Sequence, residues 1–169
     1  MSYQAMSYAV MATPIGELML VGTGHALTGC YFTGQRHLPD VASFGDRDDE
    51  IYRVAREQLA EYFGGRRTHF DIPIAPEGTE FQQRVWEQLR LIPYGQTRSY
   101  GQIAEALGGA ALTRAVGAAN GRNPLSVIVP CHRVVGADGS LTGYAGGLSR
   151  KRHLLQLEGA LAPQQDSLF

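Results

Sequence analysis

The chain has 169 residues, of which 44% are hydrophobic and 18% charged, and its formal net charge of -1 gives no sign of a nucleic-acid partner. These values are ordinary for a globular protein, and the absence of a long apolar run excludes a membrane span. The N-terminal stretch lacks the basic and apolar regions of a secretory signal, and two distant cysteines form no disulfide framework. We therefore expect a cytoplasmic protein with free thiols.

The first part of the chain alternates short apolar runs with turn residues. Three such runs lie between Tyr8 and Phe32, and Pro14 and Gly16 mark one of the turns. This spacing predicts a β-meander. Cys30 lies in the third run, where we expect a buried structural cysteine. The segment that follows, residues 34–47, is predicted to be a loop.

A helix is predicted next, from about Asp49 to Phe63, with Gly64-Gly65 as its end and an extended linker behind it. The first half holds no set of residues suited to nucleophilic catalysis. We interpret it as a small supporting domain, residues 1–76, beside a second domain, residues 77–169, in an α+β fold. The predicted apolar face of the helix consists of Ile51, Val54, Leu59, Tyr62 and Phe63.

The second half begins with a well-marked helix. Thr79 and Gln82 have the spacing of a capping box, and Pro93 stops the helix. Acids are concentrated in the first half, whereas residues 96–152 carry mainly Arg and Lys, which fits either a polyanion-binding surface or an ordinary solvated face. The side chains expected to be buried are Phe81, Val85, Trp86, Leu89 and Ile92.

Two short helices are predicted after Pro93, one from about Ser99 to Leu107 and one from near Leu112, with Gly108-Gly109 between them. This pattern is typical of a helix-turn-helix, in which the later helix enters a DNA groove, although helical hairpins are also common in cores. Between Arg114 and Arg122 the later helix carries mainly Ala and Gly, which fill a core poorly. A thin, Arg-bearing helix suits close approach to a minor groove about 6 Å wide.

The stretch from Val127 to Val129 is predicted to be a buried strand that Pro130 ends, which places Cys131 at a strand end. The glycine-rich segment 136–147 is predicted to be a flexible loop able to fold over a ligand. A last helix is expected from about Ser149 to Glu158, followed by a loose tail. Its expected buried residues are Leu154, Leu155 and Leu157.

A nucleophilic role for Cys131 requires activation, because a free thiol has a pKa of about 8.5 and only the thiolate is a strong nucleophile. His132 is adjacent in the chain, and Glu158 is a candidate to orient its imidazole. A bridging water between thiol and imidazole is plausible, since adjacent side chains at a strand end point opposite ways. The scattered histidines and the missing Cys-x-x-Cys spacing argue against a metal site.

Several of these segments together resemble the O6-alkylguanine-DNA alkyltransferase family. The resemblance is carried by Pro130-Cys131-His132-Arg133-Val134, by Arg114-Ala115-Val116-Gly117 and by Asn123-Pro124. "FQQRVWEQLRLIPYGQTRSYGQIA" and "LTGYAGGLSRK" fit the same family, so the match spans about Thr79 to Gly159. The first half resembles the family only in general layout.

The resemblance implies a role for each matched residue. Cys131 would accept the alkyl group, His132 would activate it through water, and Glu158 would hold the imidazole. Asn123 would bond backbone between the recognition helix and the segment of Cys131, and Tyr100 would donate to N3 of a flipped-out guanine. The DNA contacts implied are Ser99, Arg114, Ala115, Gly117, Ala118 and Arg122. The base pocket implied is Val134, Tyr144, Ala145, Gly146 and Lys151, with the Val134 carbonyl and the Ala145 amide on the base and Lys151 at the pocket edge.

The implied function is stoichiometric DNA repair, with no cofactor and no metal. One alkyl group would pass from O6-alkylguanine, or from O4-alkylthymine, in double-stranded DNA to Cys131, and the thioether would not be hydrolysed. Ala145 stands where relatives often have Ser, which removes a hydroxyl contact but keeps the backbone donor. A monomer is expected, with cooperative assembly on DNA left open. The alternatives are a lesion-binding or helix-turn-helix protein without chemistry, and a cysteine hydrolase.

Overall fold

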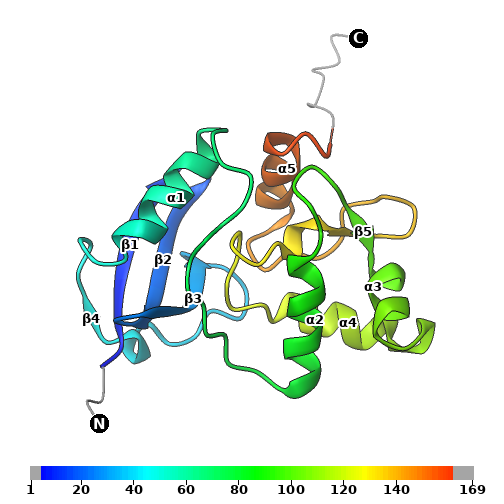
Figure 1. The fold of residues 1–169 in the computed structure, drawn as a ribbon, viewed down its shortest axis with the longest axis horizontal. Coiled ribbons are helices and arrows are strands. Elements are labelled where there is room, and N and C mark those ends of the chain that lie inside the picture. Colours follow the sequence, from blue (N-terminus) through cyan, green and yellow to red (C-terminus); the bar gives the residue numbers. More distant parts are fainter. Residues whose placement is uncertain (1–4, 162–169) are drawn as a thin grey trace.

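The computed structural model describes residues 5–161 and has two parts side by side (Figure 1). The N-terminal part contains β1 (Ser7–Thr13), β2 (Gly16–Thr23), β3 (Ala26–Phe32), β4 (Asp46–Arg47) and α1 (Arg53–Phe63). The C-terminal part contains α2 (Glu80–Arg90), β5 (Arg98–Ser99), α3 (Tyr100–Leu107), α4 (Thr113–Gly121), β6 (Val134–Val135) and α5 (Leu148–Leu157). The predicted α+β class is confirmed.

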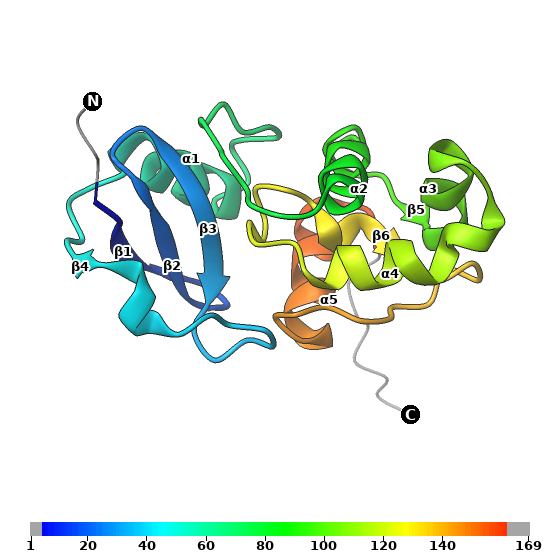
Figure 2. The same ribbon diagram turned by 90° about the horizontal axis from the view of Figure 1, so that it is seen from below.

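The predicted meander is present as the antiparallel strands β1, β2 and β3 of a four-stranded sheet in the order β3-β2-β1-β4, with α1 against it (Figures 1 and 2). Cys30 is fully buried in β3, as expected. The segment 34–47, predicted to be a loop, also contains a 3₁₀ turn, Val41–Phe44, and the two-residue strand β4, which pairs parallel to β1. A pairing of two residues leaves no period in the sequence by which it could be recognised.

The start and face of α1 differ from the prediction. The helix begins at Arg53 instead of Asp49, because Tyr52 has a left-handed backbone (φ 54°) that cannot belong to the helix. Val54, expected on the apolar face, is 58% exposed. Leu59 and Tyr62 are buried as expected, together with the polar Gln58, whose side chain bonds the backbone of Asp71.

The helices of the C-terminal part begin as the sequence predicts. Thr79 and Gln82 form the capping box of α2, and Ser99 and Gln102 form a second one at the start of α3. Phe81, expected to be buried, is only half-buried, because it lies in the first turn of α2 beside a surface groove. The other predicted residues of this face, Val85, Trp86, Leu89 and Ile92, are buried.

A helix-turn-helix is formed by α3 and α4, which pack against each other. The turn between them contains Gly108 and Gly109, with φ of 142° and 146°, and a 3₁₀ turn, Ala110–Leu112. A side chain is strained at such angles, so these two positions need glycine. α4 also packs against α2, where Trp86 Nε1 donates to the Ala119 carbonyl at 2.9 Å.

The prediction of a strand at Val127–Val129 is wrong. Only the residues just before it reach a sheet edge, where Cys30 donates to the Pro124 carbonyl at 2.8 Å and Ser126 donates to the Cys30 carbonyl at 3.0 Å. The chain then turns away, with φ of 71° at Val127, so its β-branched residues are buried without a neighbouring strand. Cys131 consequently opens a 3₁₀ turn, Cys131–Arg133, that leads into β6, and does not end a strand.

One hydrophobic cluster runs through both parts, from Leu18 and Phe32 of the sheet to Val85 of α2 and Leu154 of α5. The division of the chain into two separate domains, residues 1–76 and 77–169, therefore stays a prediction. Leu154 and Leu155 of α5 are buried as expected, whereas Leu157 is half-buried. No helix within residues 5–161 is long and apolar enough to cross a membrane, and most of the predicted tail lies outside the described residues.

Candidate functional site

The thiol of Cys131 lies just under the surface of the C-terminal part, with 3% of the residue exposed. Its backbone N–H donates to the Val129 carbonyl at 2.8 Å, and its carbonyl accepts from Asn120 Nδ2 at 3.4 Å. Burial raises the pKa of the Cys131 thiol, while a hydrogen bond from Asn123 and the charge of Lys151 act in the opposite direction. The thiol is therefore protonated at neutral pH and needs a base to become a nucleophile.

The base nearest in the chain, His132, is completely buried. Its Nε2 lies 2.7 Å from Glu158 Oε2, and a carboxylate partner there favours a proton on Nε2. Its Nδ1 is buried and has no hydrogen-bond partner in the described part of the chain. Burial lowers the pKa of His132, and the charges of Arg133 and Lys151 add to this, so the pKa lies below its ordinary value although Glu158 acts in the opposite direction. The result is a neutral imidazole with a free lone pair, which is the form that accepts a proton.

Glu158, the C-cap of α5, is the centre of a buried network. Arg133 donates from Nε to Oε1 at 2.7 Å and from Nη2 to Oε2 at 3.0 Å, and its Nη1 donates to the Ile92 carbonyl at 2.7 Å. Burial alone would raise the pKa of the Glu158 carboxyl, but the bonds and charges of His132 and Arg133 lower it to about 2. The carboxylate is thus ionised at any pH near neutrality.

Asn123 stabilises the irregular segment that precedes Cys131. Its Nδ2 donates to the Val129 carbonyl at 2.9 Å, and its Oδ1 accepts from the Leu125 backbone at 3.0 Å. These bonds replace those that a strand would have made, because the buried backbone there still needs partners. They link the end of α4 to the residues just before Cys131. Asn120, one turn earlier on α4, adds the bond to the Cys131 carbonyl and was not expected from the sequence.

Lys151 is not at a pocket edge as predicted. It is fully buried, and its Nζ donates to the carbonyls of Val134 and Thr142, both at 2.6 Å, and of Gly143 at 3.3 Å. Burial lowers the pKa of its amine to about 8. The long side chain of a lysine fits this arrangement because three carbonyls can share its three donors. Lys151 therefore ties the loop 136–147 to β6.

The loop 136–147 has no regular secondary structure, and it carries three predicted pocket residues. Tyr144 is buried, whereas Ala145 and Gly146 are partly exposed. The Ala145 carbonyl accepts from the backbone of Arg36 at 2.9 Å, which fastens the loop to the N-terminal part. The Tyr100 hydroxyl donates to the Thr142 carbonyl of the same loop at 3.2 Å.

A groove of about 650 Å³ lies between α4, the start of α2 and this loop. Tyr100, Asn120 and Tyr144 line it, whereas Cys131 lies outside its lining. Arg36 and His37, from the segment after β3, form a wall that the sequence did not suggest. The remaining lining residues are Thr79, Phe81, Gln82, Ala115, Gly117, Ala118, Ala119, Gly121, Arg122, Gly143 and Ala145.

The outward face of α4 combines two arginines with small residues. Arg114, Ala115, Ala118 and Arg122 are exposed, and Gly117 is half-buried, whereas Val116 and Ala119 face the core. Ser99, the remaining predicted DNA contact, is half-buried, and its hydroxyl accepts from the Gln102 backbone at 3.1 Å as the cap of α3. The predicted DNA-contact residues therefore lie on α4 and at the start of the helix packed against it.

These features define a class of protein: a helix-turn-helix surface with a buried cysteine, histidine and glutamate behind it, next to a small β-sheet domain. Residues 80–160 match the family described as "6-O-methylguanine DNA methyltransferase, DNA binding domain". Residues 6–76 match "6-O-methylguanine DNA methyltransferase, ribonuclease-like domain". The chain belongs to the 6-O-methylguanine DNA methyltransferase family, whose members are DNA repair enzymes.

Individual relatives are similar over nearly the whole chain. The methylated-DNA–protein-cysteine methyltransferase of Mycobacterium tuberculosis is 49% identical over 96% of this chain and 98% of that protein. The Methanosarcina acetivorans enzyme of the same name is 48% identical over 92% of this chain and 99% of that protein. Among solved structures, M. tuberculosis O6-methylguanine methyltransferase has a TM-score of 0.86 at 48% identity, covering 95% of this chain and 96% of that one. M. tuberculosis OGT in complex with DNA has a TM-score of 0.84 at 48% identity, covering 91% and 93%.

Proposed function

We propose that this chain repairs DNA by moving one alkyl group from O6-alkylguanine to Sγ of Cys131, once per molecule. The observation that carries the proposal is the buried His132, whose Nε2 is bound to Glu158 while its Nδ1 lone pair is unused. A neutral base that follows the cysteine directly in the chain and is held by an ionised carboxylate is suited to activating a cysteine nucleophile. The helix-turn-helix groove next to it is suited to DNA.

The proposed step balances as a single displacement. The Cys131 proton passes to His132 Nδ1, directly or through one water molecule, and the resulting imidazolium is stabilised by Glu158. The sulfur pair forms the S–C bond as the bond from the alkyl carbon to O6 breaks. As negative charge develops on the leaving guanine, the Tyr100 hydroxyl would donate a hydrogen bond to N3, and the guanine anion takes up the proton that left Cys131, released by His132 through water. The thioether product has no carbonyl for water to attack, so Cys131 is not regenerated.

We further propose that the target base leaves the duplex through the minor groove and enters beside Tyr144 and Ala145. An atom inside stacked DNA is out of reach of a buried sulfur, so extrusion of the base is required. Cys131 is almost completely buried and lies outside the groove lining, so the site must open for the base to arrive, and in this proposal the loop 136–147 moves. O4-alkylthymine would use the same route, since its alkyl group is also on an exocyclic oxygen.

The DNA partner would lie along α4. In this proposal Arg114 fills the space left by the extruded nucleotide, and the small residues Ala115, Gly117 and Ala118 allow the backbone of α4 to approach the groove floor. Arg122 and the exposed Arg36, which both line the groove, would contact phosphates. One molecule suffices for this chemistry, so the chain acts as a monomer, and cooperative assembly along DNA is a separate possibility.

The decisive experiment incubates the protein with a duplex oligonucleotide containing O6-methylguanine and measures the intact mass. We expect the mass of one methyl group on a peptide containing Cys131, and repair that stops when lesions converted equal protein molecules. Cys131→Ser should bind the same duplex but gain no mass. Binding without any adduct on the unaltered chain would mean a lesion-binding protein, and several repaired lesions per chain would mean a catalytic hydrolase.

A further inference from the structure

A tyrosine of the N-terminal part reaches the network behind Cys131. Tyr62 lies on α1, is fully buried, and its hydroxyl donates to Glu158 Oε2 at 2.6 Å. Its ring packs against Phe63, Phe70 and Tyr94, with centroids 5.3 to 6.3 Å apart, which holds the hydroxyl in place. Within residues 5–161 this is the one hydrogen bond that joins the N-terminal sheet-and-helix part to Glu158.

The two carboxylate oxygens of Glu158 accept different numbers of hydrogen bonds. Among the described residues, Oε1 accepts only from Arg133, whereas Oε2 accepts from His132 at 2.7 Å, from Arg133 at 3.0 Å and from Tyr62. Tyr62 and His132 therefore compete for the negative charge of one oxygen. Burial and the Glu158 charge raise the pKa of Tyr62 far above its usual range, so this hydroxyl is a permanent neutral donor.

We propose that Tyr62 is a positioning residue that limits, through Glu158, how strongly the protonated form of His132 is stabilised, and thereby sets the reactivity of Cys131. The hydrogen bond from the Tyr62 hydroxyl reduces the effective negative charge of Oε2. The bond between Oε2 and the imidazolium that forms when the thiol loses its proton is therefore weaker. The N-terminal part would then act on the chemistry itself, besides supporting the fold. The inference rests on the proposed acceptor role of Cys131.

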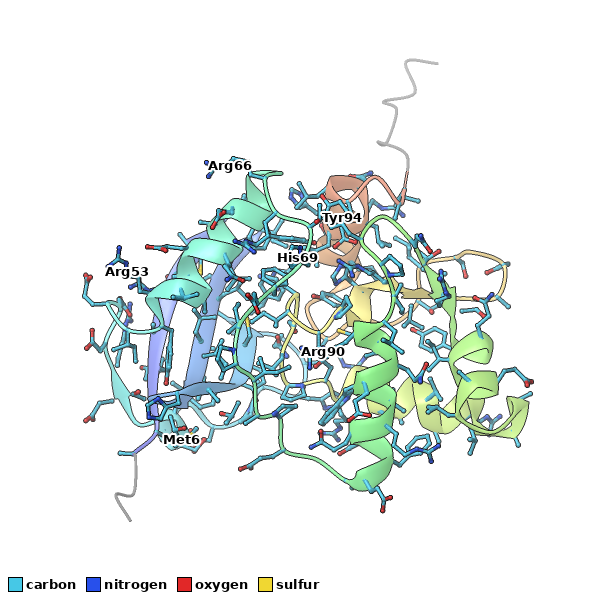
Figure 3. All side chains as sticks on the ribbon, viewed as in Figure 1. Met6, Arg53, Arg66, His69, Arg90 and Tyr94 are labelled. Atoms are coloured by element: carbon cyan, nitrogen blue, oxygen red, sulfur yellow. The ribbon has the colours of Figure 1, made fainter. Side chains whose placement is uncertain are left out.

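The other groups around Glu158 hold its carboxylate without Tyr62, so a change in the reactivity of Cys131 can be assigned to the Tyr62 hydroxyl. The 3₁₀ turn contributes His132 and Arg133, and Arg133 holds the carboxylate by both oxygens without help from Tyr62. Tyr94, near α5 in Figure 3, donates to the Leu157 carbonyl at 3.2 Å and not to the carboxylate. Lys151 of α5 acts on His132 through its charge. Removing the Tyr62 hydroxyl should therefore keep the carboxylate in place and strengthen its bond to His132.

The test uses the full chain with Tyr62→Phe, which keeps the ring packing. The rate of Cys131 methylation by methyl iodide is measured from pH 5 to pH 10 by mass spectrometry of the Cys131 peptide. We expect the midpoint of the pH–rate profile to move to lower pH by about half a unit to one unit, the scale of a hydrogen bond to a charged group. Tyr52→Phe is the matched control, because it removes a 3.0 Å bond from a tyrosine to the Ser7 carbonyl in the same part. It should leave the profile unchanged.

A second variant nearly preserves the side-chain volume and should shift the midpoint of the pH–rate profile in the opposite direction. Replacing Tyr62 by 3-fluorotyrosine makes the hydroxyl a stronger donor, so the midpoint should move to higher pH. If Tyr62→Phe does not fold, the fluorinated variant alone decides. An unchanged profile, or a shift of either variant in the wrong direction, overturns the inference. A wild-type chain that takes no methyl group from the oligonucleotide but shows these shifts would reject the proposed function and leave the role of Tyr62 standing.

Discussion

At the scale of single residues, the proposed function divides the activation of one thiol among four buried polar groups. In this proposal Cys131 would supply the sulfur, His132 the lone pair, and Glu158 the charge that favours a protonated imidazole, while Arg133 fixes Glu158 with two bonds. A buried carboxylate is costly unless it is paired and hydrogen-bonded, and here it has both kinds of partner. The same arrangement that would prepare the chemistry thus also stabilises the fold.

The ionisation of Glu158 makes a prediction about acid stability. Its pKa is lowered from the ordinary 4.5 to about 2 in the folded chain, so the unfolded state binds the proton first as pH falls. Its contribution is complete above about pH 4.5 and is lost towards pH 2, a change of about 3 kcal/mol in the free energy of unfolding. Glu158→Gln should be less stable than wild type by about 3 to 5 kcal/mol at pH 7, because Arg133 loses its partner.

Urea unfolding at several pH values checks this prediction. The difference between wild type and Glu158→Gln should narrow from pH 4.5 to pH 2. Glu57→Gln is the control, since Glu57 forms an exposed ion pair with Arg53, and exposed pairs contribute little. A constant difference between wild type and Glu158→Gln over the whole range would show that the carboxyl is not ionised in the folded chain.

At the scale of elements, α4 has two faces with different tasks. Val116 and Ala119 pack inward, and the Ala119 carbonyl is held by Trp86, while the outward face is thin and bears Arg114 and Arg122. A Cβ added at Gly117 would have its nearest neighbour, an atom of Tyr100, at 3.9 Å, which is ordinary contact. The glycine at 117 is therefore not required by the fold, and its small size is available for DNA.

This difference between the faces predicts how α4 variants behave. Gly117→Gln should keep or raise stability, since glycine costs roughly 1 kcal/mol in a helix, but should weaken duplex binding because its side chain projects into the groove. Arg114→Ala should weaken binding and base extrusion, with thiol methylation by methyl iodide nearly unchanged. Fluorescence anisotropy of a labelled duplex measures DNA binding, and mass spectrometry measures thiol methylation.

Arg53→Ala is the control for these α4 variants, because Arg53 lies on the outer side of α1, away from α4 (Figure 3). It should bind DNA like the unaltered chain. Duplex affinity that is equally strong in Gly117→Gln, Arg114→Ala and wild type would remove α4 from the proposed interface. An equal loss of binding and thiol reactivity would indicate a folding defect instead.

At the scale of the whole molecule, the two parts share one hydrophobic cluster and several hydrogen bonds, two of which involve residues of the candidate site. Tyr62 bonds Glu158, and the backbone of Arg36 bonds the Ala145 carbonyl of the loop 136–147. Elements that share a core of this kind unfold together. The N-terminal part is thus coupled to the candidate site both through packing and through the carboxylate behind His132.

This coupling predicts a single unfolding transition. The single tryptophan, Trp86, is buried in α2 and reports on the C-terminal part, whereas far-ultraviolet circular dichroism reports on both parts. The two signals should give the same midpoint in urea. Two separate midpoints would establish the division into residues 1–76 and 77–169 as independent domains.

The sequence by itself determined the local features that depend on neighbouring residues. The meander, the capping box of α2 and the two glycines between α3 and α4 follow from short-range patterns. The Pro-Cys-His-Arg-Val signature led to the family. Patterns of this kind fail where two conformations fit one composition, as at Val127–Val129, where a run typical of a strand is a buried turn.

The tertiary structure decided which distant groups meet. Lys151 was expected at the edge of the base pocket and is enclosed by three carbonyls, and Tyr62 was expected on the apolar face of a helix and also bonds a carboxylate 96 residues away. No periodicity records such contacts, because hydrogen bonds between remote residues depend on how the elements pack and not on local propensity. The sequence alone therefore indicated the candidate nucleophile through the five residues Pro130 to Val134, whereas the hydrogen-bond network of Glu158 forms only when both parts are folded together.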